Sequence, residues 1–245
     1  MTTPSDPDRL YATPREVTPF RFDEAVVRVF PDMIRRSVPG YAAMIEMTGV
    51  IAGRHAQPGS VLYDLGCSLG ATTLAMRHQV THADCRIVAI DNAPAMIDRA
   101  RGLLAAAGGG IPVELRCEDI RDSAIADASV VALNFTLQFV PQADRVPLLA
   151  RIHDGLRPGG VLVLSEKVRF DDPREQALNE SLHHAFKRAE GYSDLEIAQK
   201  RSALEQVLVP DTLDEHVARL RTAGFSDITC WFRCFNFASL VAIRS

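Results

Sequence analysis

The stretch SVLYDLGCSLG at residues 60–70 joins a short apolar run to a loop that carries two glycines. A short apolar run bounded by turn residues is typical of a buried strand. Gly66 allows the backbone to approach a bound group, and Gly70 allows the next helix to pack tightly on the strand. Ligands of open α/β sheets bind outside the carboxyl ends of the strands. The stretch therefore predicts a strand, a ligand-binding loop and a helix; a tight turn without a ligand is the alternative.

Apolar runs alternate with helical segments on both sides of this loop. The runs lie at 60–65, 86–91, 113–117, 130–135 and 161–166, with helical patterns at about 71–80, 94–106 and 142–156. This alternation is typical of a parallel sheet covered on both faces. Two further runs, at 228–235 and 237–244, have the pattern of a hairpin. We expect an α/β, Rossmann-like fold with a mostly parallel, doubly wound sheet and a C-terminal antiparallel hairpin.

The length of 245 residues favours one domain with small additions. Residues 1–20 mix Pro, Thr, Ser and Asp without periodicity, so we expect a mobile leader there. The rest, 21–245, is predicted to be one ligand-binding α/β domain. It carries a helical N-terminal extension at 21–56 and a polar helical insertion at 171–210.

Composition limits the possible partners and location. The chain has 27 Lys and Arg against 31 Asp and Glu, a net charge of -4, so direct nucleic-acid binding is not expected. No stretch approaches the roughly 18 apolar residues of a membrane span. Five scattered cysteines without a C-x-x-C pair favour a reducing, cytoplasmic location. Only Lys167, Lys187 and Lys200 are lysines, a skew that codon bias explains and to which we assign no function.

Acidic residues follow the second and third predicted strands. A carboxylate at Asp91 can accept two hydrogen bonds from a ribose diol, although Asp91 or Asn92 can instead cap the next helix. After the third strand, Asp119 can bind the exocyclic amine of an adenine and Ile120 can cover its face. The alternative for this pair is another strand-end turn. Loop and acids together indicate a nucleoside site more specifically than either alone.

Other catalytic signatures are missing from the sequence. There is no G-x-S-x-G elbow, no phosphate-binding P-loop and no H-E-x-x-H helix, which argues against serine hydrolases, P-loop NTPases and zincins. His183 and His184 are adjacent and point about 100° apart on a helix, so they cannot chelate an ion together. We predict no metal site.

The pattern Asp64-x-Gly66-x-Ser68-x-Gly70, followed by Asp91 and Asp119-Ile120, resembles the class I S-adenosylmethionine-dependent methyltransferases. Blocks outside this loop are more specific, and they resemble the carboxy-S-adenosylmethionine synthase family of bacterial wobble-uridine modification. The blocks are Phe30-Pro-Asp-Met-Ile34, Arg36-Ser-Val-Pro-Gly-Tyr41, Leu133-Asn-Phe-Thr-Leu-Gln-Phe139, Leu164-Ser-Glu-Lys167, Phe186-Lys-Arg188, Gln199-Lys-Arg201 and Trp231-Phe-Arg-Cys-Phe-Asn-Phe237. The resemblance runs from about Phe22 to Leu240.

The resemblance implies a carboxyl transfer. S-adenosyl-L-methionine and prephenate would give carboxy-S-adenosyl-L-methionine and phenylpyruvate, and a downstream tRNA carboxymethyltransferase would use the product on wobble uridine to make the 5-oxyacetic acid. The family also implies a homodimer. The implied contacts to S-adenosyl-L-methionine or carboxy-S-adenosyl-L-methionine are Tyr41, Gly66, Cys67, Ser68, Asp91, Asn92, Asp119, Ile120, Asn134 and Arg201.

Arg201 is the implied partner of the added carboxylate, because a guanidinium can grip such a group with two hydrogen bonds. The alternative is an exposed helix arginine paired with Glu205 at i, i+4. No side chain is assigned as a general base, since prephenate's own decarboxylation can supply the basicity.

Two other functions remain open at this point. An ordinary methyltransferase would use the same loop and acids, but no N/D-P-P-Y-type motif is present to supply its acceptor chemistry. A non-enzymatic module would only bind the adenosyl ligand and dock a tRNA-modifying enzyme. If the isolated protein turns over free prephenate, it is an enzyme and not such a binding module.

Overall fold

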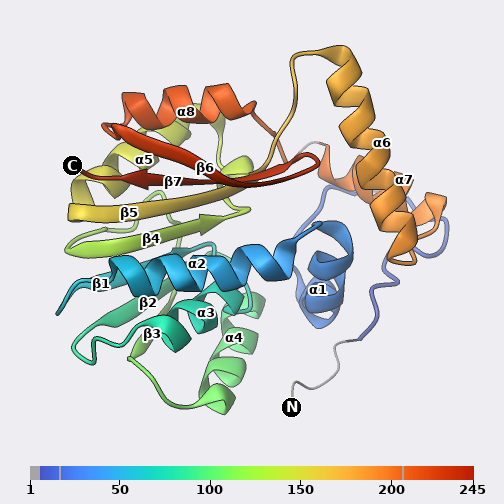
Figure 1. The fold of residues 1–245 in the computed structure, drawn as a ribbon. Helices are drawn as coiled ribbons and strands as arrows, with labels where there is room; N and C mark the ends of the chain where they lie inside the picture. The colour runs from blue at the N-terminus through green and yellow to red at the C-terminus, as the bar shows by residue number, and fades with distance from the viewer. Residues whose placement is uncertain (1–5, 17, 206) are drawn as a thin grey trace.

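A computed structural model describes residues 6–16, 18–205 and 207–245. Its centre is a seven-stranded sheet in the order β3-β2-β1-β4-β5-β7-β6 (Figure 1). The first five strands pair in parallel, and β7 and β6 add an antiparallel edge. The strands are β1 (Val61–Leu65), β2 (Arg86–Asp91), β3 (Val113–Cys117), β4 (Ala128–Asn134), β5 (Leu156–Lys167), β6 (Asp227–Cys234) and β7 (Phe237–Ile243). The predicted fold class and hairpin are therefore confirmed.

Helices cover both faces of the sheet because the central strands are apolar on both sides. Apolar side chains of α2 (Tyr41–His55) and α3 (Ala71–Gln79) pack on one face. Those of α5 (Gln142–Gly155) and α8 (Leu213–Thr222) pack on the other. The helix α4 (Pro94–Ala107) lies beside β2 and β3, and the short 3-10 turn η1 (Leu137–Phe139) follows β4. Among the described residues, no helix is both long enough and apolar enough to span a bilayer.

Three further helices gather beyond the carboxyl end of β4 (Figure 1). They are α1 (Glu24–Ser37), α6 (Pro173–Ala189) and α7 (Asp194–Leu204). Gly191, with a φ of +88°, separates α6 from α7. The next helix then begins with a capping box between Ser193 and Glu196. The helical insertion thus consists of two helices, placed at the sheet edge where ligands of this fold bind.

Part of the N-terminal segment is packed onto these helices. Asp8 is only 2% exposed. Its backbone N–H donates to Asp32 Oδ2 over 2.8 Å, and the side chain of Gln199 binds the backbone of Tyr11 and Thr13. The expectation of a mobile leader throughout 1–20 is corrected here, because the buried Asp8 carboxylate is a partner of the Lys200 ammonium. Residues 1–5 and 17 lie outside the described residues, and the limits of a single domain at 21–245 stay a prediction.

Candidate functional site

The loop between β1 and α3 is held tightly against β2. The backbone N–H groups of Gly66 and Cys67 both donate to the carbonyl of Ile90, over 2.8 and 2.9 Å. Gly66 has a φ of +78°, and a Cβ there would lie 2.2 Å from Thr136 Oγ1. Ser68 also has a positive φ, of 48°, at a position where such strain is tolerated only if the surroundings enforce it. The loop is therefore preformed, and glycine is required at position 66.

Asp91 connects this loop to the end of β2. Its Oδ2 accepts the backbone N–H of Ser68 and its Oδ1 that of Ala93, each over 2.9 Å. Burial raises the pKa of the carboxyl. Each oxygen keeps a lone pair for a further donor, so both predicted roles, a helix-start contact and a diol acceptor, are geometrically compatible. Asn92 follows as an exposed residue.

Asp119 and Ile120 lie where β3 ends. Both carboxylate oxygens of Asp119 accept hydrogen bonds from Arg121, the shortest being 2.7 Å, and this contact lowers the pKa of the carboxyl. The Ile120 side chain is buried, and its carbonyl accepts a hydrogen bond from Arg151 over 3.0 Å. An adenine amine would therefore share the Asp119 carboxylate with an arginine.

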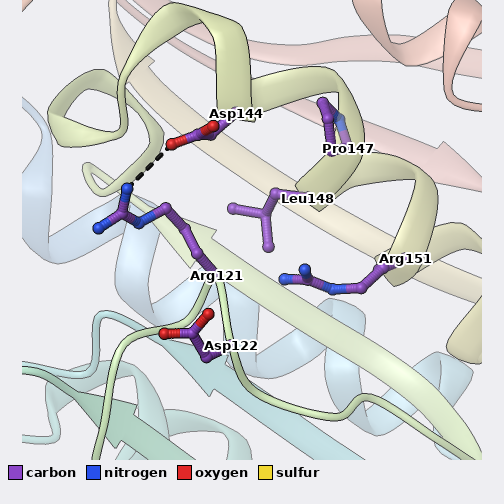
Figure 2. Close-up of a pocket in the computed structure, with 6 residues that line it drawn as sticks. All are labelled: Arg121, Asp122, Asp144, Pro147, Leu148 and Arg151. Carbon is purple, nitrogen blue, oxygen red and sulfur yellow. Dashed lines mark hydrogen bonds and ion pairs between the residues drawn. The ribbon is translucent and has the colours of Figure 1, made fainter.

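A cavity of about 350 Å³ lies beside this turn (Figure 2). Arg121 extends across it to Asp144, over 2.9 Å, and Leu148 and Arg151 line its other side. None of the ten predicted site residues lines this cavity, so we do not place the cofactor there.

Tyr41 lies near the end of β4, where Phe135 follows Asn134. The Tyr41 ring lies 6.0 Å from that of Phe135, which follows Asn134 and has a positive φ of 58°. Asn134 Nδ2 donates to Thr72 Oγ1 over 3.1 Å. The Asn134 Oδ1 atom is buried, with no hydrogen-bond partner among the described residues. A buried acceptor without a partner is costly, which makes it a ready contact for a ligand's donor.

Two buried acids belong to the site but were absent from the predicted contacts. Asp64, in β1, accepts a hydrogen bond from Thr73 Oγ1, and burial raises the pKa of its carboxyl to about 7. Glu166, in β5, accepts three backbone N–H groups at the start of η1, those of Thr136, Leu137 and Gln138. Burial raises the pKa of Glu166 to about 8. An acid inside an otherwise apolar strand run is the sequence signal that can find such residues.

Glu166 acts as a brace for the loop after β4. Its three backbone contacts fix the turn that follows Asn134 and Phe135 and that carries Thr136 beside Gly66. Glu166 therefore positions this loop through its backbone.

Arg201 lies apart from the other predicted contacts. Its side chain is 54% exposed, and it pairs with Glu180 on α6 and Glu205 at i, i+4, each over 2.9 Å. These are the contacts of the alternative interpretation, that of a surface arginine. The structure thus brings the loop, Asp91, Tyr41 and Asn134 into one region at the carboxyl edge of the sheet, and leaves Arg201 in a separate ion pair on the covering helices.

Known proteins resemble the chain in sequence. Residues 62–160 match a family model described as "Methyltransferase domain". A carboxy-S-adenosyl-L-methionine synthase from Trichlorobacter lovleyi is 61% identical over 97% of this chain and 98% of its own length. Another from Marinobacter nauticus is 58% identical over 97% and 95%.

Solved structures resemble the chain in fold. The methyltransferase SibL superposes with a TM-score of 0.65 at 18% identity, over 100% of this chain and 63% of its own. Human N-acetylserotonin methyltransferase superposes with a TM-score of 0.62 at 15% identity, over 90% and 55%. This likeness concerns the fold alone. The high identity over nearly the full length of the curated relatives is the stronger observation, and it shows that the chain belongs to the carboxy-S-adenosyl-L-methionine synthase family.

Proposed function

We propose that the enzyme transfers a carboxyl group from prephenate to the methyl group of S-adenosyl-L-methionine. The products are carboxy-S-adenosyl-L-methionine and phenylpyruvate. The observation that carries this proposal is the 61% identity to a synthase of this name over 97% of the chain. The preformed Gly66 loop at the sheet edge supports it independently.

The atoms of this reaction balance without an added oxidant or base. Prephenate loses CO2 and hydroxide and becomes phenylpyruvate. S-adenosyl-L-methionine supplies a methyl group that its sulfonium makes acidic, a C–C bond forms between that methyl carbon and CO2, and the methyl proton leaves with the hydroxide as water. The chain's task is to hold both partners close and to exclude water.

The residues present fit an adenosyl sulfonium ligand. The glycine loop offers a close backbone approach, and Asp91 offers a buried carboxylate for a ribose diol. Asn134 Oδ1 is a buried acceptor that awaits a donor, and Asp64 places a further carboxyl behind the loop. We infer that Tyr41, Cys67, Ser68, Asn92, Asp119 and Ile120 complete the cofactor contacts.

Arg201 is proposed to bind the carboxylate that the reaction adds. To do so its guanidinium exchanges Glu180 or Glu205 for the ligand. We expect Arg201→Ala to weaken binding of carboxy-S-adenosyl-L-methionine by about tenfold or more, because a charge-assisted hydrogen bond is lost, while binding of S-adenosyl-L-methionine changes little. Calorimetry with both ligands measures this. Arg188→Ala is the matched control, since Arg188 is also 54% exposed and paired with an acid. Equal losses for both ligands would contradict the role.

The reaction itself is tested by mass spectrometry of the ligand that co-purifies with the protein. The protein is then incubated with S-adenosyl-L-methionine, with and without prephenate. We expect a species heavier than S-adenosyl-L-methionine by one CO2 that increases only with prephenate. Unmodified or demethylated cofactor under every condition would return the protein to the methyltransferases, whose fold it shares.

The product leads to a further proposal about partners. We infer that the enzyme works in the cytoplasm as a homodimer and supplies a tRNA carboxymethyltransferase that modifies wobble uridine. The net charge of -4 supports a division of labour in which that partner, and not this chain, binds the tRNA. Sedimentation equilibrium is the measurement for the dimer, with an expected mass of about twice 26.9 kDa.

A further inference from the structure

All three lysines of this arginine-rich chain are at least partly buried. Lys200 is 5% exposed and Lys187 is 9% exposed, and Lys167 at the end of β5 is half-buried. Lysine is one of the residues found least often in the interior of a protein. Codon usage explains why arginine outnumbers lysine, but it does not explain why the three lysines lie at positions with little exposed surface.

In the part of the chain that the structure describes, only one of the three ammonium groups has protein partners. Lys200 Nζ donates to Ser37 Oγ over 2.9 Å and lies 3.4 Å from Asp8 Oδ2. Within the described ranges, neither Lys167 nor Lys187 has a hydrogen bond or ion pair at its ammonium group. The charges of Glu180 and Glu205 oppose the lowering of the pKa of Lys167, but both acids already pair with Arg201.

A row of rings connects the surroundings of Lys167 and Lys187 with the proposed site. Lys167 pairs with Phe237 in the register of β5 and β7. The Phe237 ring lies 6.1 Å from Phe135, next to Asn134, and 5.1 Å from His183. His183 is one helical turn before Lys187, so both side chains lie on the same face of α6. Lys167 and Lys187 therefore lie at one end of a row of rings that runs from Tyr41 through Phe135 to Phe237.

The charged groups around Lys187 are the cations Lys200, Lys167 and Arg201, whereas Lys167 also has Glu180 and Glu205 nearby. Burial, followed by the nearby Lys187, lowers the pKa of His183 to about 3, so this imidazole is neutral and donates from Nε2 to the carbonyl of Ser37 over 2.8 Å. Burial, with Lys200, Lys167 and Arg201 as further causes, lowers the pKa of Lys187 to about 7. Within the described residues, neither ammonium nitrogen is among the fully buried polar atoms that lack a partner, so both remain accessible to a ligand. A perturbed pKa next to a binding region is a common feature of functional sites.

We propose that Lys167 and Lys187 form the carboxylate-binding site for the carboxyl-donor co-substrate. This inference rests on the proposed function, which requires an organic carboxylate such as prephenate to lie beside the methyl group of S-adenosyl-L-methionine. Arg201 is proposed to bind the carboxylate that the reaction adds. Lys167 and Lys187, whose ammonium groups have no hydrogen bond or ion pair within the described residues, are therefore the cations that remain for the co-substrate. Two lysines beside a row of rings also suit a ligand that carries carboxylates on an apolar ring.

The first experiment measures steady-state kinetics of Lys187→Met and Lys167→Met. Methionine keeps the length of the side chain and removes its charge. We expect the KM for prephenate to rise about tenfold or more in each variant, because a charge-assisted contact to a carboxylate is lost. The dissociation constant of S-adenosyl-L-methionine should stay within about twofold. Arg188→Met is the matched control on α6, because Arg188 is exposed and paired with Asp194.

The second experiment reads the lysines directly, without turnover. In protein labelled with 13Cε-lysine only three signals are expected, since the chain has only Lys167, Lys187 and Lys200. Titration with prephenate, in the absence of S-adenosyl-L-methionine, should shift two of these signals and raise the pH at which they titrate. The signal of Lys200, assigned by Lys200→Met, should stay in place.

The outcomes separate this inference from the function on which it rests. If the unaltered enzyme forms no carboxylated product, the proposed function fails. If it does form product, but both methionine variants keep the KM for prephenate and the lysine signals do not respond, only the lysine site is overturned. Loss of affinity for carboxy-S-adenosyl-L-methionine with an unchanged KM for prephenate would also overturn it, because the site would then bind the product. The titration of unaltered protein keeps the test valid if a variant folds poorly.

Discussion

Gly66 illustrates how a single backbone position controls the ligand loop. Its φ of +78° suits glycine, and an added Cβ would lie 2.2 Å from Thr136 Oγ1. We expect Gly66→Ala to lose about 2 kcal/mol or more of stability and most of its affinity for S-adenosyl-L-methionine, because the turn must move away from β4. Urea unfolding and calorimetry measure the two effects. Gly102→Ala is the control, since nothing lies within 4 Å of a Cβ there; similar losses in both variants would contradict this interpretation.

Asp64 should make the stability of the protein depend on pH. Burial raises the pKa of this carboxyl from 3.8 to about 7, so the folded chain binds more protons than the unfolded chain between these values. The free energy of unfolding must therefore fall as the pH rises through this range. Asp64→Asn should make this pH-dependent loss of stability smaller by on the order of 3 kcal/mol. The part of the loss that comes from the raised pKa of Glu166 should remain. Urea unfolding at several pH values tests it, with the exposed Asp98→Asn as the control; an unchanged slope would show that Asp64 is not the source.

Elements of the covering layer are joined by a buried ion pair. Asp8, on the N-terminal segment, faces Lys200 on α7 and accepts a hydrogen bond from Tyr192. We expect Asp8→Ala to cost about 3 kcal/mol, because it leaves a buried ammonium without its counter-charge. Thermal unfolding measures this, and the exposed Asp6→Ala should change it little. The double variant Asp8→Ala, Lys200→Met should recover much of the loss. If the double variant is as unstable as the single one, the ion pair is not the cause.

The α6 and α7 helices show which features of an element are local. The capping box at Ser193 and Glu196 depends only on residue types and their spacing, so the start of α7 is a local feature. The inward face of α6 has no such signal. His183 and Lys187 are polar residues on a polar helix, and they are buried only because α6 lies against β7 and the end of α1.

At the scale of the whole molecule, binding of the cofactor should stabilise the fold. A ligand that binds only the folded chain adds about 2.7 kcal/mol when its concentration is about 100 times its Kd. For a chain of this size we therefore expect S-adenosyl-L-methionine to raise the Tm by about 5–10 °C. Differential scanning fluorimetry measures the shift. Gly66→Ala at the same ligand concentration should show a much smaller rise, and an unshifted Tm of the unaltered chain would contradict the proposed site.

The sequence by itself determined the order of strands and helices, the glycine loop at 66–70 and the acid at Asp91. These features depend on apolar periodicity, on glycine's access to positive φ and on strand ends that always meet at one edge of a parallel sheet. Only the tertiary structure decided that Asp8 is buried, that Arg201 pairs with Glu180, and that Lys167 and His183, one turn before Lys187, come together at Phe237. Residues so far apart in the chain meet through packing. Their burial and charge balance depend on neighbours that no local pattern specifies.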